Sequence, residues 1–423
     1  MLHKFTRTLF LVSLLLMSIG AFAQDDAADD DVFAPPGFDN WDAVLEAARG
    51  TTVNWYMWGG SDAINEFVDE FYGVPLEEEF GITLNRVPLA DTADAVNLVL
   101  NELEAGVDDG SVDLIWINGE NFFTLRQADA LYGPWAEEIP NSTLVDWENP
   151  AVAFDFGTPV EGYESPWSSA QLQLIYDTAR ISEEDLPSNY DELTTYIKEN
   201  PGRFTYIAPG PGAFQGTRFV KQALYHVSGG VDQWTGEWNQ ELFDQYSPNL
   251  WSLLNTWEPN LWREGETYPA TENELHELFA NGEVDFTVTQ ATAGAGPLIE
   301  AGLIPPTSRA FVFDEYAIGD FNYVAIPSNA SNPAAAMVLA NLILRPDRQA
   351  GHILPETGFG LGYAIDLTQV SEEELAILEE SLTLLGEGAA DAADLQAAFA
   401  PDMAPESQSA IEDGWEQNVL LGD

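Results

Sequence analysis

The feature that most constrains the fold is an alternation of strand-like and helix-like segments in the first third of the chain. Residues 51–58 (TTVNWYMW) are rich in β-branched and aromatic residues, and apolar residues then recur at helical spacing over 61–80. The same pair of patterns returns at 81–89 and 92–106, and a third strand is expected at 112–118. Strands and helices that alternate in this way build a parallel sheet covered by helices. We therefore predict an α/β fold.

A second series of the same kind predicts a second lobe. An extended segment at 165–177 leads into the series, and another extended run at 321–327 leads back out of it. Between them we expect a helix at 191–200, a strand at 203–209, helices at 216–229 and 273–283, and a strand at 284–290. The helical chain after residue 333 is expected to complete the first lobe. The predicted domains are lobe 1, residues 41–170 and 310–423, and lobe 2, residues 171–309, joined by a hinge of two crossover segments.

The N-terminus has the pattern of a cleavable secretion signal. Two basic residues precede an apolar run at 9–19, and residues 21–23 (AFA) form a small-x-small cleavage site. A membrane anchor is the alternative, but the run is shorter than the ~20 residues that a spanning helix needs. We expect cleavage after Ala23, so that residues 1–23 are a signal peptide and residues 24–40 a disordered acidic leader.

The chain contains no cysteine. This excludes disulfides, thiolate nucleophiles and zinc sites built from cysteine, and it also excludes the cysteine that a bacterial lipid anchor requires. Together with the secretion signal, it predicts a free periplasmic protein without a lipid anchor.

The charge balance is strongly acidic. The sequence has 71 Asp and Glu against 14 Lys and Arg, for a net charge of −57. At molar salt the screening length falls to ~3 Å, so repulsion between like charges is confined to close neighbours. Because the acids are spread along the entire chain, we interpret them as adaptation to a salty exterior; a polyanionic surface for one cationic partner is the alternative. Nucleic acid is excluded as a partner, since no basic face exists to neutralise phosphates.

The loop after the first expected strand is a candidate binding corner. Trp58 ends the strand, two glycines follow, and Ser61 stands where the next helix begins. Ser61 has the position of a helix N-cap, and capping alone is one interpretation. The other is that Trp58, Gly60 and Ser61 form a corner where a ligand approaches unpaired backbone N–H groups.

The loop after the third expected strand is a second candidate. Asn118, Glu120 and Asn121 stand together at the strand's end, beside Phe122 and Phe123. Amide side chains both donate and accept hydrogen bonds, which suits a neutral or zwitterionic polar ligand. A turn held by side-chain hydrogen bonds is the alternative for each residue taken singly. Ligands of parallel sheets bind beyond the carboxyl ends of the strands, where both corners lie.

Two further stretches would face the same cleft from the hinge and from the second lobe. Trp167 and Ser168 lie in the crossover segment, with ordinary hinge packing as the alternative for Trp167. Gly216 and Thr217 open the expected helix after a glycine-rich loop, and Arg218 beside them is a possible anion contact. The loop lacks the Gly-Lys-Ser/Thr ending of a phosphate-binding loop, so nucleotide hydrolysis is rejected.

The remaining chemistry-bearing residues define no catalytic or metal site. His226, His276 and His352 are scattered without metal-ligand spacing, and structural roles are expected for them. No metal and no cofactor is expected. Acid pairs are so frequent that a secreted, glycosidase-like hydrolase acting through paired carboxylates remains the rival function. Five tryptophans between residues 234 and 262 are assigned to packing, with stacking on a sugar or an amine as the alternative.

Several of these stretches together resemble a known family. WGGSDAINEF, DLIWINGENFFTLRQADALYGPW, PWSSAQLQLIYD, PGPGAFQGTRFVKQALYH, LFANGEVDFTVT and FNYVAIPSNASNPAAAMVLANLILRPDRQA cover nearly the whole chain after the signal. They are similar to the type II solute-binding proteins of bacterial ABC importers, the extracellular solute-binding protein family 1, in a branch near the thiamine, polyamine and iron binders. The iron binders use adjacent tyrosines, and this sequence has no Tyr-Tyr pair.

The resemblance implies a type II periplasmic-binding-protein fold that closes on one small molecule and presents it to a membrane permease. It implies no catalysis and a cleft lined by ten residues: Trp58, Gly60, Ser61, Asn118, Glu120, Asn121, Trp167, Ser168, Gly216 and Thr217. Excess acid together with tryptophan favours a cationic or aromatic amine as the ligand, while a sugar stays open. We expect a monomer whose partners are this small molecule and an ABC transporter permease in the inner membrane.

Overall fold

The computed structural model describes residues 33–210, 213–354, 357, 359–384 and 386–422. The expected signal peptide and most of the expected leader lie outside these ranges. Residues 33–40 are not the disordered leader predicted for them: Phe33 and Phe38 pack against the core, and the Tyr132 hydroxyl donates a hydrogen bond to the Pro36 carbonyl. The first helix, α2 (Trp41–Ala48), begins directly after them, with the Asn40 side chain capping it.

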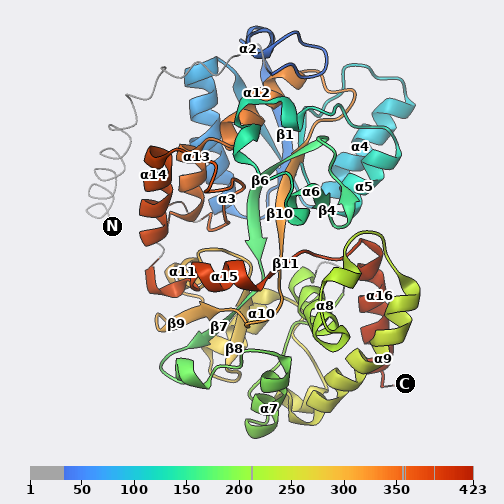
Figure 1. The fold of residues 1–423 in the computed structure, drawn as a ribbon, viewed down its shortest axis with the longest axis vertical. Helices are drawn as coiled ribbons and strands as arrows, with labels where there is room; N and C mark the ends of the chain where they lie inside the picture. The colour runs from blue at the N-terminus through green and yellow to red at the C-terminus, as the bar shows by residue number, and fades with distance from the viewer. Residues whose placement is uncertain (1–32, 211–212, 355–356, 358, 385, 423) are drawn as a thin grey trace.

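The chain folds into two α/β lobes stacked along the long axis of the molecule (Figure 1). The sheet of the first lobe has the order β11-β10-β3-β1-β2, with β6 also paired to β10. Its strands are β1 (Thr52–Trp58), β2 (Thr83–Leu89), β3 (Leu114–Ile117), β6 (Glu164–Gln171), β10 (Ala317–Ala325) and β11 (Phe399–Ala400). β1 runs parallel to β2 and β3, whereas β10 runs antiparallel to β3 and β6. The predicted α/β class and two-lobed architecture are confirmed.

Helices cover both faces of this sheet. The helices α3 (Asp62–Phe67), α4 (Thr92–Glu104) and α5 (Glu120–Gln127) follow β1, β2 and β3, as the alternation predicts. One face packs against α2 and the nearly all-apolar α12 (Pro333–Ile343), whose Ala335 to Leu339 are fully buried. The other face packs against α4 and α5 through residues such as Val99 and Phe122. Helices α13 (Pro346–Ala350) and α14 (Glu372–Thr383) stand at the side of this lobe (Figure 1).

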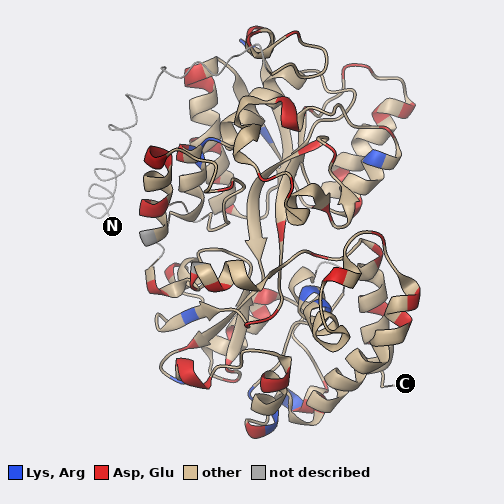
Figure 2. Cartoon of the chain, in the orientation of Figure 1, with Lys and Arg blue, Asp and Glu red and all other residues tan. Residues whose placement is uncertain are grey.

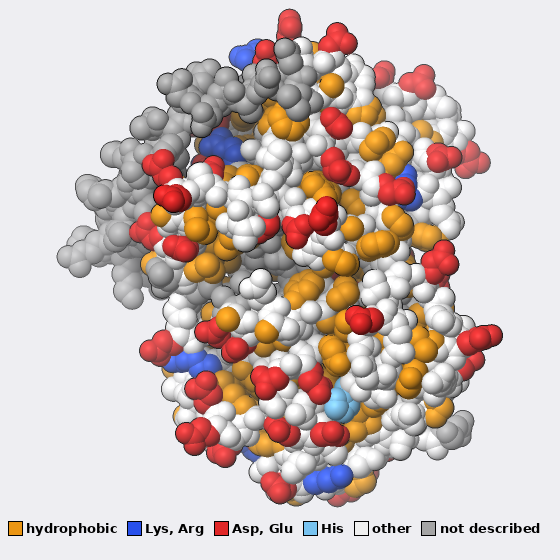
Figure 3. All heavy atoms as spheres, in the orientation of Figure 1, with side chains coloured by type: hydrophobic (Ala, Val, Ile, Leu, Met, Phe, Trp, Pro, Cys, Tyr) orange, Lys and Arg blue, Asp and Glu red, His pale blue; other side chains and the backbone are white. Residues whose placement is uncertain are grey.

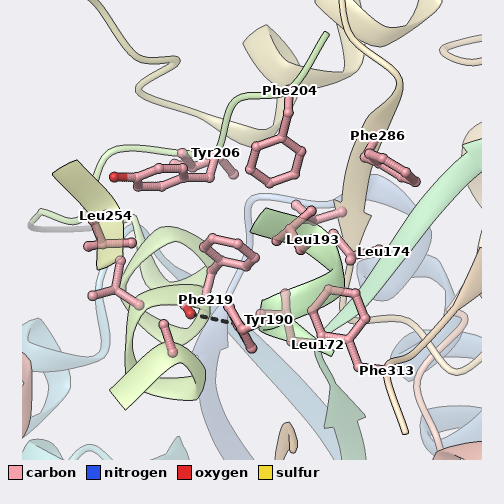
Figure 4. Packing of buried hydrophobic residues seen from close by; sticks show 14 of the residues in the cluster. Leu172, Leu174, Tyr190, Leu193, Phe204, Tyr206, Phe219, Leu254, Phe286 and Phe313 are labelled. Carbon is pink, nitrogen blue, oxygen red and sulfur yellow. Dashed lines mark hydrogen bonds between the residues drawn. The ribbon is translucent and has the colours of Figure 1, made fainter. Parts of the chain in front are cut away.

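The second lobe has a three-stranded antiparallel sheet. Its middle strand β7 (Gln173–Asp177) pairs with β8 (Phe286–Thr289) and β9 (Ser308–Phe311). The helices around it are α7 (Tyr190–Glu199), α8 (Phe214–Ser228), α9 (Gln240–Trp257), α10 (Glu272–Ala280) and α11 (Gly296–Glu300). Figure 4 shows how aromatic and leucine side chains from several of these elements meet, with the Tyr190 hydroxyl donating to the Phe219 carbonyl. Trp234, Trp251 and Trp257 belong to this core, as expected for packing tryptophans.

One expected strand of the second lobe is absent from the structure. Residues 203–209 are extended and largely buried, but no strand is formed over them. Their backbone groups bond singly to other segments: the Phe204 carbonyl accepts from Trp262 N, and Ala208 N donates to the Pro269 carbonyl. The apolar run therefore reflects burial against α8 and not membership of a ladder.

The lobes are joined by three crossings, one more than predicted. The first is the step from β6 to β7, and the second is β10, which follows β9 of the second lobe and pairs with β3 of the first. The third follows α14, because the Gly388 carbonyl already accepts from Ala295 N in the second lobe. Residues of α16 (Glu406–Trp415), such as Trp415, pack in the core of the second lobe. This packing differs from the expected placement of all of 310–423 in lobe 1: the last part of the chain, from α15 (Ala392–Ala398) onward, contributes to lobe 2.

Within the part of the chain that the structure describes, no helix has the length and apolarity required to span a membrane. Acidic residues are spread over both lobes in the ribbon of Figure 2, and their side chains are scattered over the face of the molecule seen in Figure 3. The interpretation of these acids as adaptation to a salty exterior stays a prediction.

Candidate functional site

The end of β1 carries an exposed indole. Trp58 is 40% exposed, and its ring meets that of Trp116 edge to face at 6.5 Å between centroids. A Cβ added to Gly60 would overlap the Trp58 ring, so the glycine makes room for the indole. Ser61 confirms the capping interpretation, because its Oγ accepts from Ile64 N at 3.3 Å at the start of α3.

The second corner is fixed from two sides. Asn118 Nδ2 donates to the Phe321 carbonyl of β10 at 2.7 Å, and Gly119 N donates to Asp155 Oδ2 at 2.5 Å. Gly119 has φ +57° and ψ −123°, a conformation that only glycine adopts readily. Glu120 is exposed at the start of α5, and Asn121 is half-buried with its N–H donating to the Asn118 carbonyl. The corner is thus a rigid turn that leaves the Glu120 side chain in solvent.

The hinge strand β6 is linked to both corners by aromatic and polar contacts. Trp167 stacks edge to face on Trp116, with ring centroids 4.9 Å apart. Trp116 Nε1 donates to Asn322 Oδ1 at 3.2 Å, and Asn322 Nδ2 donates to Ser168 Oγ at 3.0 Å. Trp167 is completely buried, which corrects the expectation that its ring faces the cleft. Its size fills the space between the sheet and the segment after α13, where it also touches Phe359.

The second lobe contributes the start of α8, but not through the two residues predicted. Gly216 is buried where the helix packs tightly on the backbone of Ile207. Thr217 is also buried, and its Oγ1 lies 3.2 Å from Glu412 Oε1 of α16. The Cα of Gly216 and the side chain of Thr217 therefore both pack within the second lobe. Phe214, which is 46% exposed, and Arg218 are the residues of this helix that reach across.

Arg218 anchors a buried group of charges at the hinge. Its guanidinium bonds to Gln290 and to Asp320 of β10, and Nε donates to Asp402 Oδ2 at 3.1 Å. Lys221 Nζ donates to the other oxygen of Asp402 at 2.8 Å. We call Asp155, Arg218, Lys221, Asp320 and Asp402 the hinge charge cluster. Figure 2 shows the basic part of α8 at the end of the helix nearest the first lobe.

Burial and pairing set the protonation of these carboxyl groups. Burial acts to raise the pKa of Asp402, but Lys221 and Arg218 outweigh it and the pKa is lowered. The pKa of Asp320 is raised by burial in spite of Arg218. Burial also raises the pKa of Asp155 well above the ordinary value, and the single backbone donor at Gly119 does not compensate. Asp402 is thus held as a carboxylate, while Asp155 favours its protonated form.

A cavity lies between the lobes beside this cluster. The first lobe contributes the loop between α6 (Pro150–Ala153) and β5 (Thr158–Pro159), including β4 (Phe154–Asp155). The second lobe contributes residues from two separate loops. The lining residues are Pro150, Ala151, Phe154, Asp155, Phe156, Gly157, Thr235, Gly236, Gly319, Asp320, Phe321, Tyr323, Pro401 and Asp402.

The structure thus brings most of the predicted residues to one region. Trp58, Asn118 and Ser168 are connected through Trp116 and β10, and α8 reaches the same strand through Arg218 and Asp320. Sequence reasoning missed Asp155, Lys221, Asp320, Asn322 and Asp402, which come from four distant segments. One of these residues could have been found from the sequence. Lysine is rare in this chain, and Lys221 lies one helical turn beyond Arg218, which marks a basic face on this helix.

The histidines have the structural roles expected for them. His352 is completely buried, with Nε2 2.6 Å from the Tyr72 hydroxyl and Nδ1 3.1 Å from the Gly362 carbonyl. His276 Nδ1 lies 2.8 Å from Thr287 Oγ1. Among the described residues, no group of three or more His, Asp or Glu is arranged to hold a metal ion.

Comparisons with known proteins agree with this architecture. Residues 72–360 match the family model described as bacterial extracellular solute-binding protein. The chain is 38% identical over 311 residues to Protein YnjB of Escherichia coli (strain K12), covering 73% of this chain and 79% of the relative.

Solved structures show the same two-lobed fold at low sequence identity. A putative extracellular solute-binding protein from Bordetella parapertussis is similar with a TM-score of 0.61 and 16% identity, over 87% of this chain and 98% of the other. The spermidine/putrescine ABC transporter substrate-binding protein PotD from Streptococcus pneumoniae is similar with a TM-score of 0.59 and 14% identity, also over 87% and 98%. The family match, the relative and the shared fold lead to one conclusion: the chain belongs to the bacterial extracellular solute-binding protein family.

Proposed function

We propose that this solute-binding protein captures a small molecule between its lobes, outside the cytoplasm, and delivers it to an ABC import permease without catalysing a reaction. One observation supports this most: Asn118 of the first lobe and Arg218 of the second bind neighbouring residues of the same hinge strand, Phe321 and Asp320. The facing surfaces of the two lobes therefore meet at β10. Rotation of the lobes about this strand would open or close the space between them.

Closure needs no chemistry, only ligand contacts that are better in the shut state than in the open one. A ligand that touches Trp58 on the first lobe and Phe214 on the second gains both contacts only when the lobes approach. The shift toward the closed form cannot exceed this difference in affinity. Of the predicted residues, we assign Trp58, Asn118, Glu120 and Asn121 to this surface, and Gly60, Ser61 and Ser168 to the support behind it.

For the ligand we propose a cationic or aromatic amine. Trp58 offers an exposed indole face for a cation–π contact, and Asp320 and Asp155 supply carboxyl groups at the base of the interlobe region. PotD, with the same fold, is described as a spermidine/putrescine protein. A sugar stacked on Trp58 and bonded to Asn118 is the second candidate, because amide groups suit hydroxyls.

The test is a thermal-shift screen of small amines and sugars against the mature chain at molar salt, because a ligand that prefers the folded state raises the melting temperature. We expect amines to raise it, and Trp58→Ala to reduce that shift. Val74→Ala, which removes an exposed apolar side chain of the first lobe away from both candidate corners, is the control. A shift with sugars and none with amines would overturn the ligand class.

The rival is a secreted hydrolase acting through paired carboxylates. It predicts that one of the compounds in a glycoside and ester panel is consumed, whereas capture predicts that every bound compound is recovered unchanged.

We also propose that the protein acts in the periplasm as a monomer, after removal of its signal peptide. Sedimentation at molar salt tests the monomer.

A further inference from the structure

The hinge holds more buried carboxyl groups than buried cationic groups. Arg218 and Lys221 supply two positive charges, while Asp155, Asp320 and Asp402 supply three carboxyl groups, and Glu164 on β6 is a fourth buried acid nearby. Arg218 and Lys221 are engaged by Asp320 and Asp402. Asp155 and Glu164 are left without a cationic side chain bonded to them, and a buried unpaired charge is strongly unfavourable.

Asp155 is the acid of this group that lines the cavity between the lobes without a cationic side chain bonded to it. It is 1% exposed, its Oδ2 accepts from Gly119 N, and its Oδ1 has no hydrogen-bond partner although it is buried. It lines the cavity between the lobes, which has a volume of about 20 Å³. That is room for one group the size of a water molecule. Four aromatic residues, Phe154, Phe156, Phe321 and Tyr323, line the same cavity.

We propose that this cavity is a subsite for a primary ammonium group, which donates a hydrogen bond to Asp155 Oδ1 and lies against the aromatic rings. An –NH₃⁺ group has the size of the cavity, carries the charge that the cluster lacks, and supplies the donor that Oδ1 lacks. The subsite rests on the proposed function, because it would receive the charged end of an amine held between the lobes. A quaternary ammonium is too large and has no N–H to donate.

The subsite couples amine binding to proton release. The groups that face Asp155 are Asp320 and Tyr323 on β10, Arg218 and Lys221 on α8, Asp402 beyond β11 and Glu164 on β6. Burial raises the pKa of Asp155 well above its ordinary value, so without a ligand the carboxyl tends to hold a proton. An ammonium group replaces that proton, and the affinity for the amine therefore rises with pH up to the raised pKa.

The experiment uses methylammonium chloride as the probe, with choline chloride keeping the ionic strength constant at about 1 M. We expect methylammonium to raise the melting temperature of the mature chain in a saturable manner, and tetramethylammonium to leave it unchanged. Asp155→Asn, which keeps the shape and the acceptor for Gly119 N but cannot carry charge, is expected to lose the shift. Asp108→Asn, at an exposed position of the first lobe, removes the same charge and is expected to keep it.

Equal shifts with both ions, or a shift that survives in Asp155→Asn, would overturn the subsite. If Asp155→Asn fails to fold, calorimetry on the unmodified chain in two buffers of different ionisation heat decides. A proton released on methylammonium binding supports the subsite, and no proton released refutes it. The subsite and the proposed function can fail independently. If a larger solute binds while methylammonium does not, the subsite is refuted and the proposed capture of a solute is not.

Discussion

The Phe156 ring of the first lobe meets the Phe214 ring of the second lobe edge to face, with centroids 6.5 Å apart and an interplanar angle of 84°. Phe156 follows Asp155, which holds the Asn118–Glu120 corner through Gly119 N, and its ring lies within about 6 Å of the charged ends of both Arg218 and Lys221. A single residue thus joins the candidate binding corner, the hinge charge cluster and the opposite lobe.

The first prediction concerns this contact. Phe156→Ala and Phe214→Ala should each shift the lobes away from the arrangement seen here, because an aromatic pair is worth about 0.5–1.5 kcal/mol. The double variant should shift them no further than the larger single effect. Since the chain has no cysteine, labels on cysteines introduced at Asp108 and Glu199 report the interlobe distance directly. Val74→Ala, at an exposed position of the first lobe away from both candidate corners, should leave the distance unchanged, and additive effects of the two ring deletions would contradict the pairing.

The second prediction concerns Gly119. A Cβ at this position would stand 3.3 Å from the Phe156 ring, in a backbone conformation that side chains rarely adopt. Gly119→Ala should therefore lower the free energy of unfolding by about 1–3 kcal/mol. Gly106→Ala is the matched control, because Gly106 also has a positive φ but nothing lies near its missing Cβ. Urea denaturation that finds equal losses for the two variants would show that Phe156 does not constrain the corner.

The sequence predicts the local structure of this protein, but it does not predict contacts between distant segments. The alternation of strands and helices gave the class of both lobes, because periodicity reports which side of each element is buried. It placed Ser61 and Asn118 at strand ends, where local chemistry marks the turn. It did not give the partners of Arg218, because Asp320 and Asp402 stand 102 and 184 residues away in the chain and look like any other acid in so acidic a sequence.

The errors have the same origin. Residues 203–209 have the composition of a strand, but no strand in the described part of the chain lies beside them to form a ladder. An apolar, β-branched composition indicates that a segment is buried; it does not indicate which segment accepts its hydrogen bonds. Trp167 stands in the hinge as predicted, yet only the packing of Trp55 and Trp116 around it shows that the ring is enclosed. The third crossing was missed because the last helices follow lobe-1 helices without a strand pattern between them.

The third prediction concerns acid stability. Burial lowers the pKa of His352 to about 4, compared with ~6.5 in an unfolded chain. Between these two pH values the unfolded chain binds the proton more tightly than the folded chain does. The contribution of neutral His352 to the free energy of unfolding is therefore fully present above pH 6.5 and is lost as the pH falls toward 4. The loss from this residue is roughly 3 kcal/mol. Raised carboxyl pKa values at Asp155 and Glu164 act in the opposite direction, so the unmodified chain alone does not isolate it.

The measurement is the difference in unfolding free energy between the unmodified chain and His352→Gln, followed from pH 7 to pH 4. The two values should converge as the pH falls, because the glutamine variant lacks the titrating group. Parallel curves for the unmodified chain and His352→Gln would refute the assignment.

The fourth prediction concerns salt. With a net charge of −57, the folded chain should melt at a lower temperature in millimolar than in molar salt, because the screening length grows from ~3 Å at 1 M to ~30 Å at 0.01 M. Sodium, potassium and choline chlorides should act alike if screening is the cause. A melting temperature that does not change with salt concentration would remove the interpretation of the acids as salt adaptation.

The central claim is that the two lobes shut around a solute. The most direct measurement is small-angle X-ray scattering of the mature chain at molar salt, with and without a solute that raises its melting temperature. We predict that the radius of gyration falls when the solute binds, that it stays at the unliganded value in Trp58→Ala at the same solute concentration, and that the solute is recovered intact. A bound solute that leaves the radius of gyration unchanged, or one that is consumed, would contradict it.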